Sequence, residues 1–175
     1  MVNKYNELLK NMRNSDERRI DRTIKFIGRH ITDDAILDLG VPNKLTARLK
    51  EFDVENTTGQ DLDVNYNVVH QYDFIIALEI FEHMFAPFNI LNEASGKLIA
   101  SVPLKLWFAS AYWPDEKLDR HYHEFEKKQF DALLERTGWT IKDSEMWTAW
   151  SYKIGFRSIL RLFHKRHYII YAEKD

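Results

Sequence analysis

The sequence predicts an α/β fold of three layers, in which helices cover both faces of a mostly parallel sheet. Residues 72–78 and 97–102 contain continuous apolar runs, Phe74 to Leu78 and Leu98 to Ala100, without the alternation of a strand that has one solvated face. Such runs are typical of strands that are buried on both faces, as in a parallel sheet. Segments with helical spacing lie between the strand candidates, and this alternation indicates parallel strands joined by crossover helices.

The first 30 residues predict two helices that precede the sheet. Asn14 and Glu17 have the spacing of a capping box, and isoleucines follow at helical intervals. Residues 35–40 are a short apolar run that ends in glycine, which indicates the first strand and a turn after it. Residues 52–57 are a weaker strand candidate.

The middle of the chain predicts further crossover elements. Residues 84–94 indicate a short helix between the two buried strands, with a proline near its start. Residues 104–122 are irregular and rich in aromatic side chains. Residues 125–137 indicate a helix, and Gly138 ends it because glycine accepts the left-handed conformation of a C-terminal cap.

Two late strands close the predicted sheet. One begins at residues 139–141 and the other covers residues 167–172, so we expect a hairpin-like edge with an antiparallel strand near the C-terminus. Between them, residues 153–165 have the pattern of a basic amphipathic helix. Such a helix can lie on a membrane surface, but its basic stripe is more often a solvated face, so membrane contact is not the favoured interpretation.

Length and composition indicate one domain over residues 1–175, made of N-terminal helices (1–30) and a sheet core (35–175) that carries the aromatic loop 104–122. The net charge of -2 gives no indication of nucleic-acid binding, and the absence of cysteine excludes disulfides and thiolate chemistry. No apolar stretch approaches the ~20 residues of a bilayer span, and the polar start has no signal-peptide pattern. We therefore expect a cytoplasmic location; nothing in the pattern indicates an oligomeric state.

Four segments, in this order, carry a resemblance to a known family. They are a strand ending in Asp-Leu-Gly (36–40), a strand followed by Glu-x-x-Glu-His (72–83), a third strand (96–103), and His-x-His-Glu-Phe (121–125) before a helix and Gly-Trp. Together they resemble the class I S-adenosylmethionine-dependent methyltransferases, of the small-molecule type with the Glu-x-x-Glu-His signature. The resemblance implies a Rossmann-like methyltransferase fold, S-adenosylmethionine as cofactor and a small-molecule acceptor.

The glycine loop departs from the family's pattern. The family's first loop normally reads Asp-x-Gly-x-Gly-x-Gly, whereas here only Gly40 remains, followed by Val41 and Pro42. This leaves two hypotheses, an active methyltransferase and a catalytically inactive relative that serves as a binding or assembly module. A third is a peripheral membrane enzyme with a lipid-like acceptor, which depends on residues 153–165.

Predicted cofactor contacts begin at the ends of the first two strands. Ligands of open α/β sheets bind at the carboxyl ends of strands. Asp38 would orient the loop or meet the methionine ammonium, and Gly40 would let the cofactor approach the backbone. Glu55 would accept hydrogen bonds from the ribose hydroxyls, and Asp61 from the adenine amino group. The alternatives are an ordinary strand-end turn and a solvated acidic loop.

Glu79, Glu82 and His83 follow the buried strand directly, and we expect Glu79 and His83 to line the cofactor cleft. They would face the same side of a helix that begins there. Two carboxylates and an imidazole could hold a divalent ion, as the resemblance implies for ubiquinone-pathway O-methyltransferases. Our prediction is nevertheless no metal, with Glu79 capping the next helix and His83 packed under the cofactor.

The acceptor side of the pocket is predicted from the aromatic loop and two histidines. Trp107, Tyr112 and Trp113 would form an apolar wall around the acceptor. His121 or His123 could act as general base, because the pKa of histidine is near neutral. The alternatives are that the rings only cover the sheet edge and that the histidines belong to a helix cap.

Overall fold

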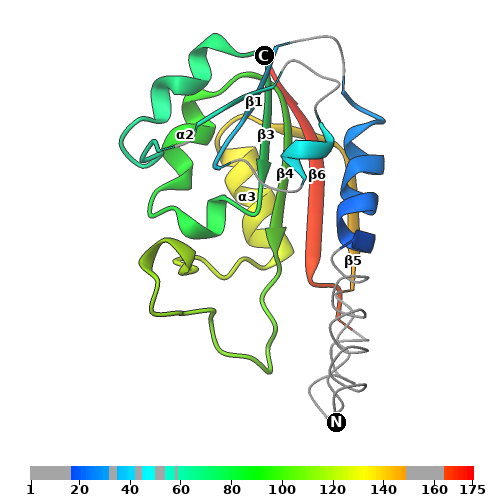
Figure 1. Ribbon diagram of the computed structural model, residues 1–175, viewed down its shortest axis with the longest axis vertical. Helices are drawn as coiled ribbons and strands as arrows, with labels where there is room; N and C mark the ends of the chain where they lie inside the picture. The colour runs from blue at the N-terminus through cyan, green and yellow to red at the C-terminus, as the bar shows by residue number, and fades with distance from the viewer. Residues whose placement is uncertain (1–16, 32–34, 42–44, 50–53, 58, 149–163) are drawn as a thin grey trace.

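The computed structural model shows one sheet of six strands with helices on both faces (Figure 1). The structure describes residues 17–31, 35–41, 45–49, 54–57, 59–148 and 164–175. The strands are β1 (Ile36–Asp38), β2 (Val54–Asn56), β3 (Phe74–Leu78), β4 (Gly96–Pro103), β5 (Thr140–Trp147) and β6 (His167–Lys174). The helices are residues 17–27, α2 (Pro87–Glu93) and α3 (Lys127–Arg136). Short 3-10 helices are η1 (Thr46–Arg48), η2 (Tyr66–Gln71), η3 (Phe81–His83) and η4 (Lys117–Asp119).

The strand order is β2-β1-β3-β4-β6-β5. The first four strands in the chain run parallel, β6 runs antiparallel to β4, and β5 runs antiparallel to β6. This confirms the predicted fold class, a mostly parallel sheet in three layers with an antiparallel edge near the C-terminus.

Alternate residues of the central strands pack into two separate cores, because successive side chains of a β-strand point to opposite faces of the sheet. On one face, Ile75 and Leu98 pack with residues of α2, α3 and η3. On the other face, Phe74 and Ile99 pack with Phe26 and the rest of the apolar side of helix 17–27. Because both faces are covered, the strands are apolar throughout, which is the pattern that identified them in the sequence.

Several local predictions differ from the structure. After β1 the described region contains a single 3-10 turn, η1. The helix predicted for residues 84–94 starts only at Pro87, as α2, and the missing N–H of this proline suits the first turn of a helix. No helix begins at Glu79, which has a φ of 56°, so the segment reaches η3 only at Phe81. Most of the predicted basic helix, residues 153–165, lies outside the described residues.

The part of the chain that the structure describes contains no helix long and apolar enough to cross a membrane.

Candidate functional site

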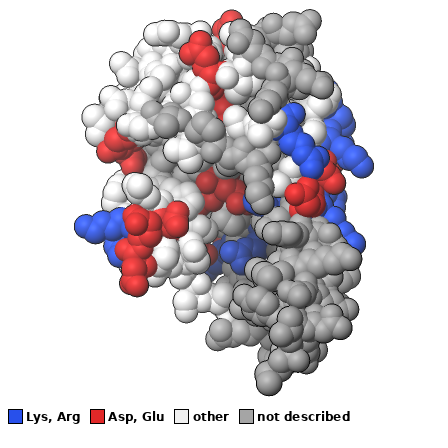
Figure 2. Space-filling model, in the orientation of Figure 1, with Lys and Arg blue, Asp and Glu red and all other residues white. Residues whose placement is uncertain are grey.

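One edge of the sheet collects the polar side chains of the site. The carboxyl ends of β1 to β4 meet there because these strands are parallel, and ligands of open α/β sheets bind at this edge. The antiparallel strand β6 begins at the same edge, since His167 pairs with Pro103, the last residue of β4. Near the centre of the face in Figure 2, acidic and basic side chains lie close together.

At the end of β1, the chain's own side chains hold the predicted cofactor loop. The Asp38 carboxylate accepts hydrogen bonds from Thr46 Oγ1 (2.8 Å) and Asn56 Nδ2 (3.2 Å). Burial raises the pKa of Asp38, and these two hydrogen bonds offset only part of that effect. The Gly40 N–H donates to Thr57 Oγ1 at 2.7 Å. A ligand at this loop would therefore have to exchange with existing hydrogen bonds.

The two acidic residues predicted to bind ribose and adenine are exposed and have local partners. The Tyr72 hydroxyl donates to Glu55 Oε2 at 2.5 Å, and the Asp63 N–H donates to Asp61 Oδ1 at 3.0 Å. Asp63 accepts the backbone N–H of Phe85 (2.9 Å) and of Ala86 (2.7 Å), and so holds the approach to α2.

Glu79 joins three distant parts of the chain. Its carboxylate accepts a hydrogen bond from Arg19 Nη1 (2.8 Å), on helix 17–27, and one from His167 Nδ1 (3.0 Å), on β6. Burial alone would raise the pKa of Glu79, but the His167 hydrogen bond and the Arg19 charge outweigh it and lower the pKa to about 2. Glu79 is thus a charged anchor, and its partners differ from those of His83.

Glu82, His83 and His121 form a second cluster, called here the Glu82 cluster. The Glu82 side chain is 1% exposed, and its Oε2 has no hydrogen-bond partner among the described residues. His83 Nδ1 donates to the Arg120 carbonyl at 3.0 Å, and His83 Nε2 lies 3.8 Å from Glu82 Oε1. The His121 ring stands edge-on to the His83 ring, with centroids 4.9 Å apart.

The surroundings of the Glu82 cluster favour the neutral forms of Glu82 and His121. Burial raises the pKa of Glu82 well above its ordinary value, and the charges of Glu79 and Glu124 add to this although its own backbone N–H opposes it. Burial lowers the pKa of His121, as do the charges of His83 and Arg166, against the opposing carboxylates. An uncharged imidazole is therefore available as a proton acceptor or a metal ligand.

The Glu82 cluster also fits a divalent cation. One ligand atom from each of the three residues lies within 4.8 Å of the others. A carboxylate oxygen with two imidazole nitrogens is a donor set that zinc and similar borderline ions take. The set differs from the one weighed in the sequence, because Glu79 is held by Arg19 and His167 whereas His121 joins Glu82 and His83.

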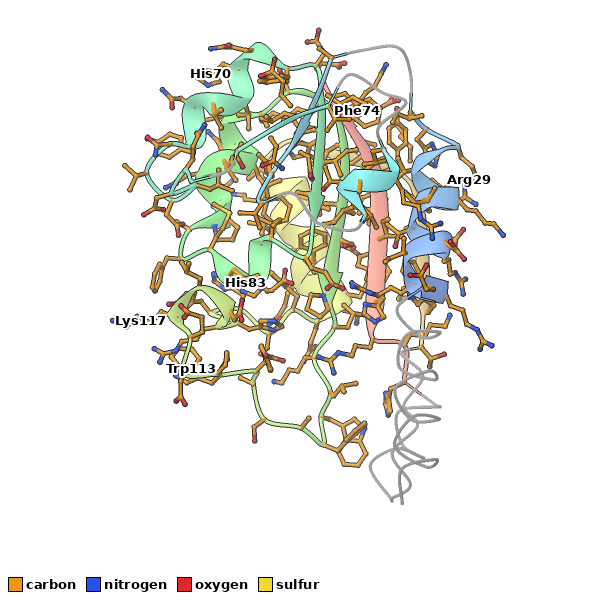
Figure 3. The ribbon with its side chains drawn as sticks, viewed as in Figure 1. Arg29, His70, Phe74, His83, Trp113 and Lys117 are labelled. Carbon is orange, nitrogen blue, oxygen red and sulfur yellow. The ribbon has the colours of Figure 1, made fainter. Side chains whose placement is uncertain are left out.

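A cavity of about 280 Å³ opens beside His121. It is lined by the end of β4, by Tyr112 and Trp113 of the aromatic loop, and by Glu124 and Arg166. Figure 3 shows Trp113 and His83 in the same lower part of the molecule. The volume of the cavity is near the lower end of the range for small-molecule sites.

Two other predicted pocket residues lie outside this cavity's lining. Trp107 is 70% exposed, and its indole N–H donates to His164 Nε2 at 2.8 Å. The His123 ring stacks on Phe125, and its Nε2 donates to the Phe85 carbonyl at 3.3 Å. Of the two histidines, the structure therefore brings only His121 to the cavity wall.

Solved structures of other proteins have folds similar to that of this chain. No family model and no curated protein sequence matches the chain. Solved structures do: a Burkholderia thailandensis 1,6-didemethyltoxoflavin-N1-methyltransferase with bound substrate and S-adenosylhomocysteine has 15% identity and a TM-score of 0.59, over 99% of this chain and 90% of that one. A Mesorhizobium loti S-adenosylmethionine-dependent methyltransferase has 15% identity and a TM-score of 0.53, over 82% and 92%.

The [4+2]-cyclase SpnF is also similar, with 13% identity and a TM-score of 0.57 over 89% of this chain and 80% of that one. The chain thus has the fold of S-adenosylmethionine-dependent methyltransferases. Because a protein named as a cyclase shares this fold, the activity has to be argued from the site.

Proposed function

We propose that this chain is an S-adenosylmethionine-dependent methyltransferase that acts on a small-molecule acceptor. The observation that carries the proposal is the cavity at the carboxyl edge of a methyltransferase fold, with the neutral imidazole of His121 in its wall. The similar Burkholderia enzyme binds a small molecule and S-adenosylhomocysteine.

The cofactor would lie across the ends of β1 to β3. Asp38 and Gly40 would face its methionine part, Glu55 its ribose and Asp61 its adenine, while Glu79 and His83 would close the side toward the acceptor; this assignment follows the resemblance noted in the sequence. Bound there, S-adenosylmethionine supplies a methyl group on a sulfonium, which needs chiefly a nucleophile held in line.

The chain's residues would position the acceptor and take its proton. Tyr112 and Trp113 would hold a flat acceptor and keep water away, with Trp107 covering the outer side of the loop. His121 would accept the proton that the acceptor heteroatom loses on methylation, and Glu124, whose Oε1 lies 3.6 Å from His121 Nδ1, would stabilise the imidazolium. His123, which contacts the Phe85 carbonyl, is the second candidate for this proton transfer.

Titration of the full chain with S-adenosylhomocysteine in a calorimeter is expected to give saturable heat. Gly40→Ala is expected to weaken binding at least tenfold, because the backbone φ of 111° strains any residue with a Cβ and would shift the loop that faces the cofactor. Absence of heat and of a thermal shift at millimolar ligand would contradict the proposal. The non-catalytic module would then be favoured, consistent with the internal hydrogen bonds of Asp38 and Gly40.

Glu82→Gln tests the Glu82 cluster. Without divalent ions, the variant is expected to be more stable than the wild type at pH 8, by about 1 to 3 kcal/mol. The raised pKa makes the folded chain keep a proton that the unfolded chain releases above 4.5, so wild-type stability falls as the pH rises from 4.5 toward the raised pKa. Glu82→Gln does not lose stability in this way, because its side chain does not titrate. The difference in the free energy of unfolding between the variant and the wild type should vanish near pH 4.5. Urea unfolding at several pH values measures it.

The same variant decides whether the Glu82 cluster takes a cation. If it does, Zn²⁺ or Mn²⁺ added to EDTA-treated wild type raises the melting temperature, and Glu82→Gln abolishes this rise. Glu135→Gln, an exposed change on α3, serves as the matched control. A wild type that neither ion stabilises would show that the cluster holds a proton rather than a metal.

A further inference from the structure

Arg166 is fixed at the mouth of the cavity by its backbone. Its N–H donates to the Trp147 carbonyl at 2.9 Å, at the end of β5, and its carbonyl accepts the N–H of Leu104, just beyond β4. The residue thus sits between two strand ends, directly before β6. Its side chain lines the cavity and is half-buried.

The Arg166 guanidinium has no carboxylate partner among the described residues. Two carboxylates described above already have other partners. Glu79 is held by Arg19 and His167, and Glu124 accepts the Tyr112 N–H at 3.0 Å and lies beside His121. A guanidinium that is partly removed from water and lacks an anionic partner favours an anion supplied from outside.

The remaining walls of the cavity suit a flat, compact body. Tyr112 and Trp113 line the cavity together with Pro103, the last residue of β4, and Leu104, which follows it. The rings are 51% and 58% exposed, so they have free surface to offer a ligand. The cavity therefore combines an aromatic wall with the positive charge of Arg166, for which the described residues offer no carboxylate partner.

We propose that this cavity binds a planar small molecule that carries an oxyanion, a carboxylate or a phosphate, and that Arg166 recognises the oxyanion. A guanidinium matches either group through two parallel N–H···O hydrogen bonds. That the bound molecule is the methyl acceptor rests on the proposed function; the binding itself does not. Arg166 is thus a specificity-determining residue that the acceptor chemistry alone would not indicate.

The test measures binding of small probes to the full chain without cofactor. The probes are benzoate and phenyl phosphate, with benzamide and phenol as their neutral counterparts. Binding of each probe is followed by the change in tryptophan fluorescence, to which Trp113 in the cavity wall is expected to contribute. We expect each oxyanion to bind at least tenfold more tightly than its neutral counterpart. Arg166→Gln should reduce this preference to less than twofold without lowering the melting temperature. Arg136→Gln, at the exposed end of α3, should keep it.

Each other outcome has a definite meaning. Equal binding of charged and neutral probes, or a preference that survives Arg166→Gln, overturns the proposal. A fluorescence change that persists undiminished in Trp113→Phe comes from the other tryptophans, places the probe away from Trp113 and also overturns the proposal. If the oxyanions bind as expected but S-adenosylhomocysteine does not, the oxyanion site stands and the proposed methyltransferase activity falls. If S-adenosylhomocysteine binds and the preference is absent, only the oxyanion site falls.

Discussion

Gly96→Ala is expected to lower the free energy of unfolding by about 3 kcal/mol or more, which would make it among the most damaging single substitutions in the chain. Gly96 begins β4 with a φ of 80°, and a Cβ there would lie 2.3 Å from the Asp73 carbonyl oxygen. That oxygen belongs to the backbone and already accepts the Lys97 N–H at 2.8 Å, so it cannot move aside without breaking the sheet.

Gly59→Ala is the matched control for this effect. Gly59 also has a positive φ, of 76°, but a Cβ there would meet nothing within 4 Å. Its expected cost is only that of the backbone conformation, about 1 to 2 kcal/mol. Urea unfolding of both variants separates the two terms. Equal losses would show that the close approach of Gly96 to Asp73 does not exist in solution.

His121→Asn is expected to reduce turnover of an acceptor by about a hundredfold or more, with S-adenosylhomocysteine affinity and melting temperature nearly unchanged. The acceptor would come from a screen of aromatic carboxylates and phosphates. His121 lines the cavity and its pKa is lowered, so the wild type should hold its neutral form, and its activity, at and somewhat below neutral pH. The activity should fall only as the pH drops through that lowered pKa.

His123→Asn decides between the two histidines predicted from the sequence. If His123 is the base, its variant loses turnover and His121→Asn does not. A fall in melting temperature with activity spared, in either variant, would assign that histidine a structural role. His70→Asn, an exposed histidine on η2 that pairs with Glu93 at 2.8 Å, is the control for a general effect of losing an imidazole.

The elements that the sequence predicts well are those whose signal is local. Strands β3 and β4 have unbroken apolar runs because both of their faces are covered, and Gly138 ends α3 with a φ of 89°. The end of β3 could not be predicted in this way. Glu79 adopts a left-handed conformation, and its carboxylate is held by Arg19 and His167, which lie 60 and 88 residues away in the sequence.

The sequence indicates which edge of the sheet the candidate residues reach, and their roles there are proposals. The strand ends, the aromatic loop and the segment His-x-His all lie at the carboxyl edge or in the loops above it, because parallel strands bring their ends together. Arg166 was missed, since its place follows only from the antiparallel direction of β6 beside β4. Similarly, only the packing of His123 on Phe125 separates it from His121.

The placement of β6 between β4 and β5 has a consequence for synthesis of the chain. While the chain emerges from the ribosome, β4 and β5 are both complete before β6 exists, and in the finished sheet neither pairs with the other. For that interval the long apolar edge of β4 is unpaired, which is the kind of edge that recruits strands from other molecules. Productive folding of this sheet therefore depends on keeping that edge apart from other nascent chains until residues 167–174 arrive.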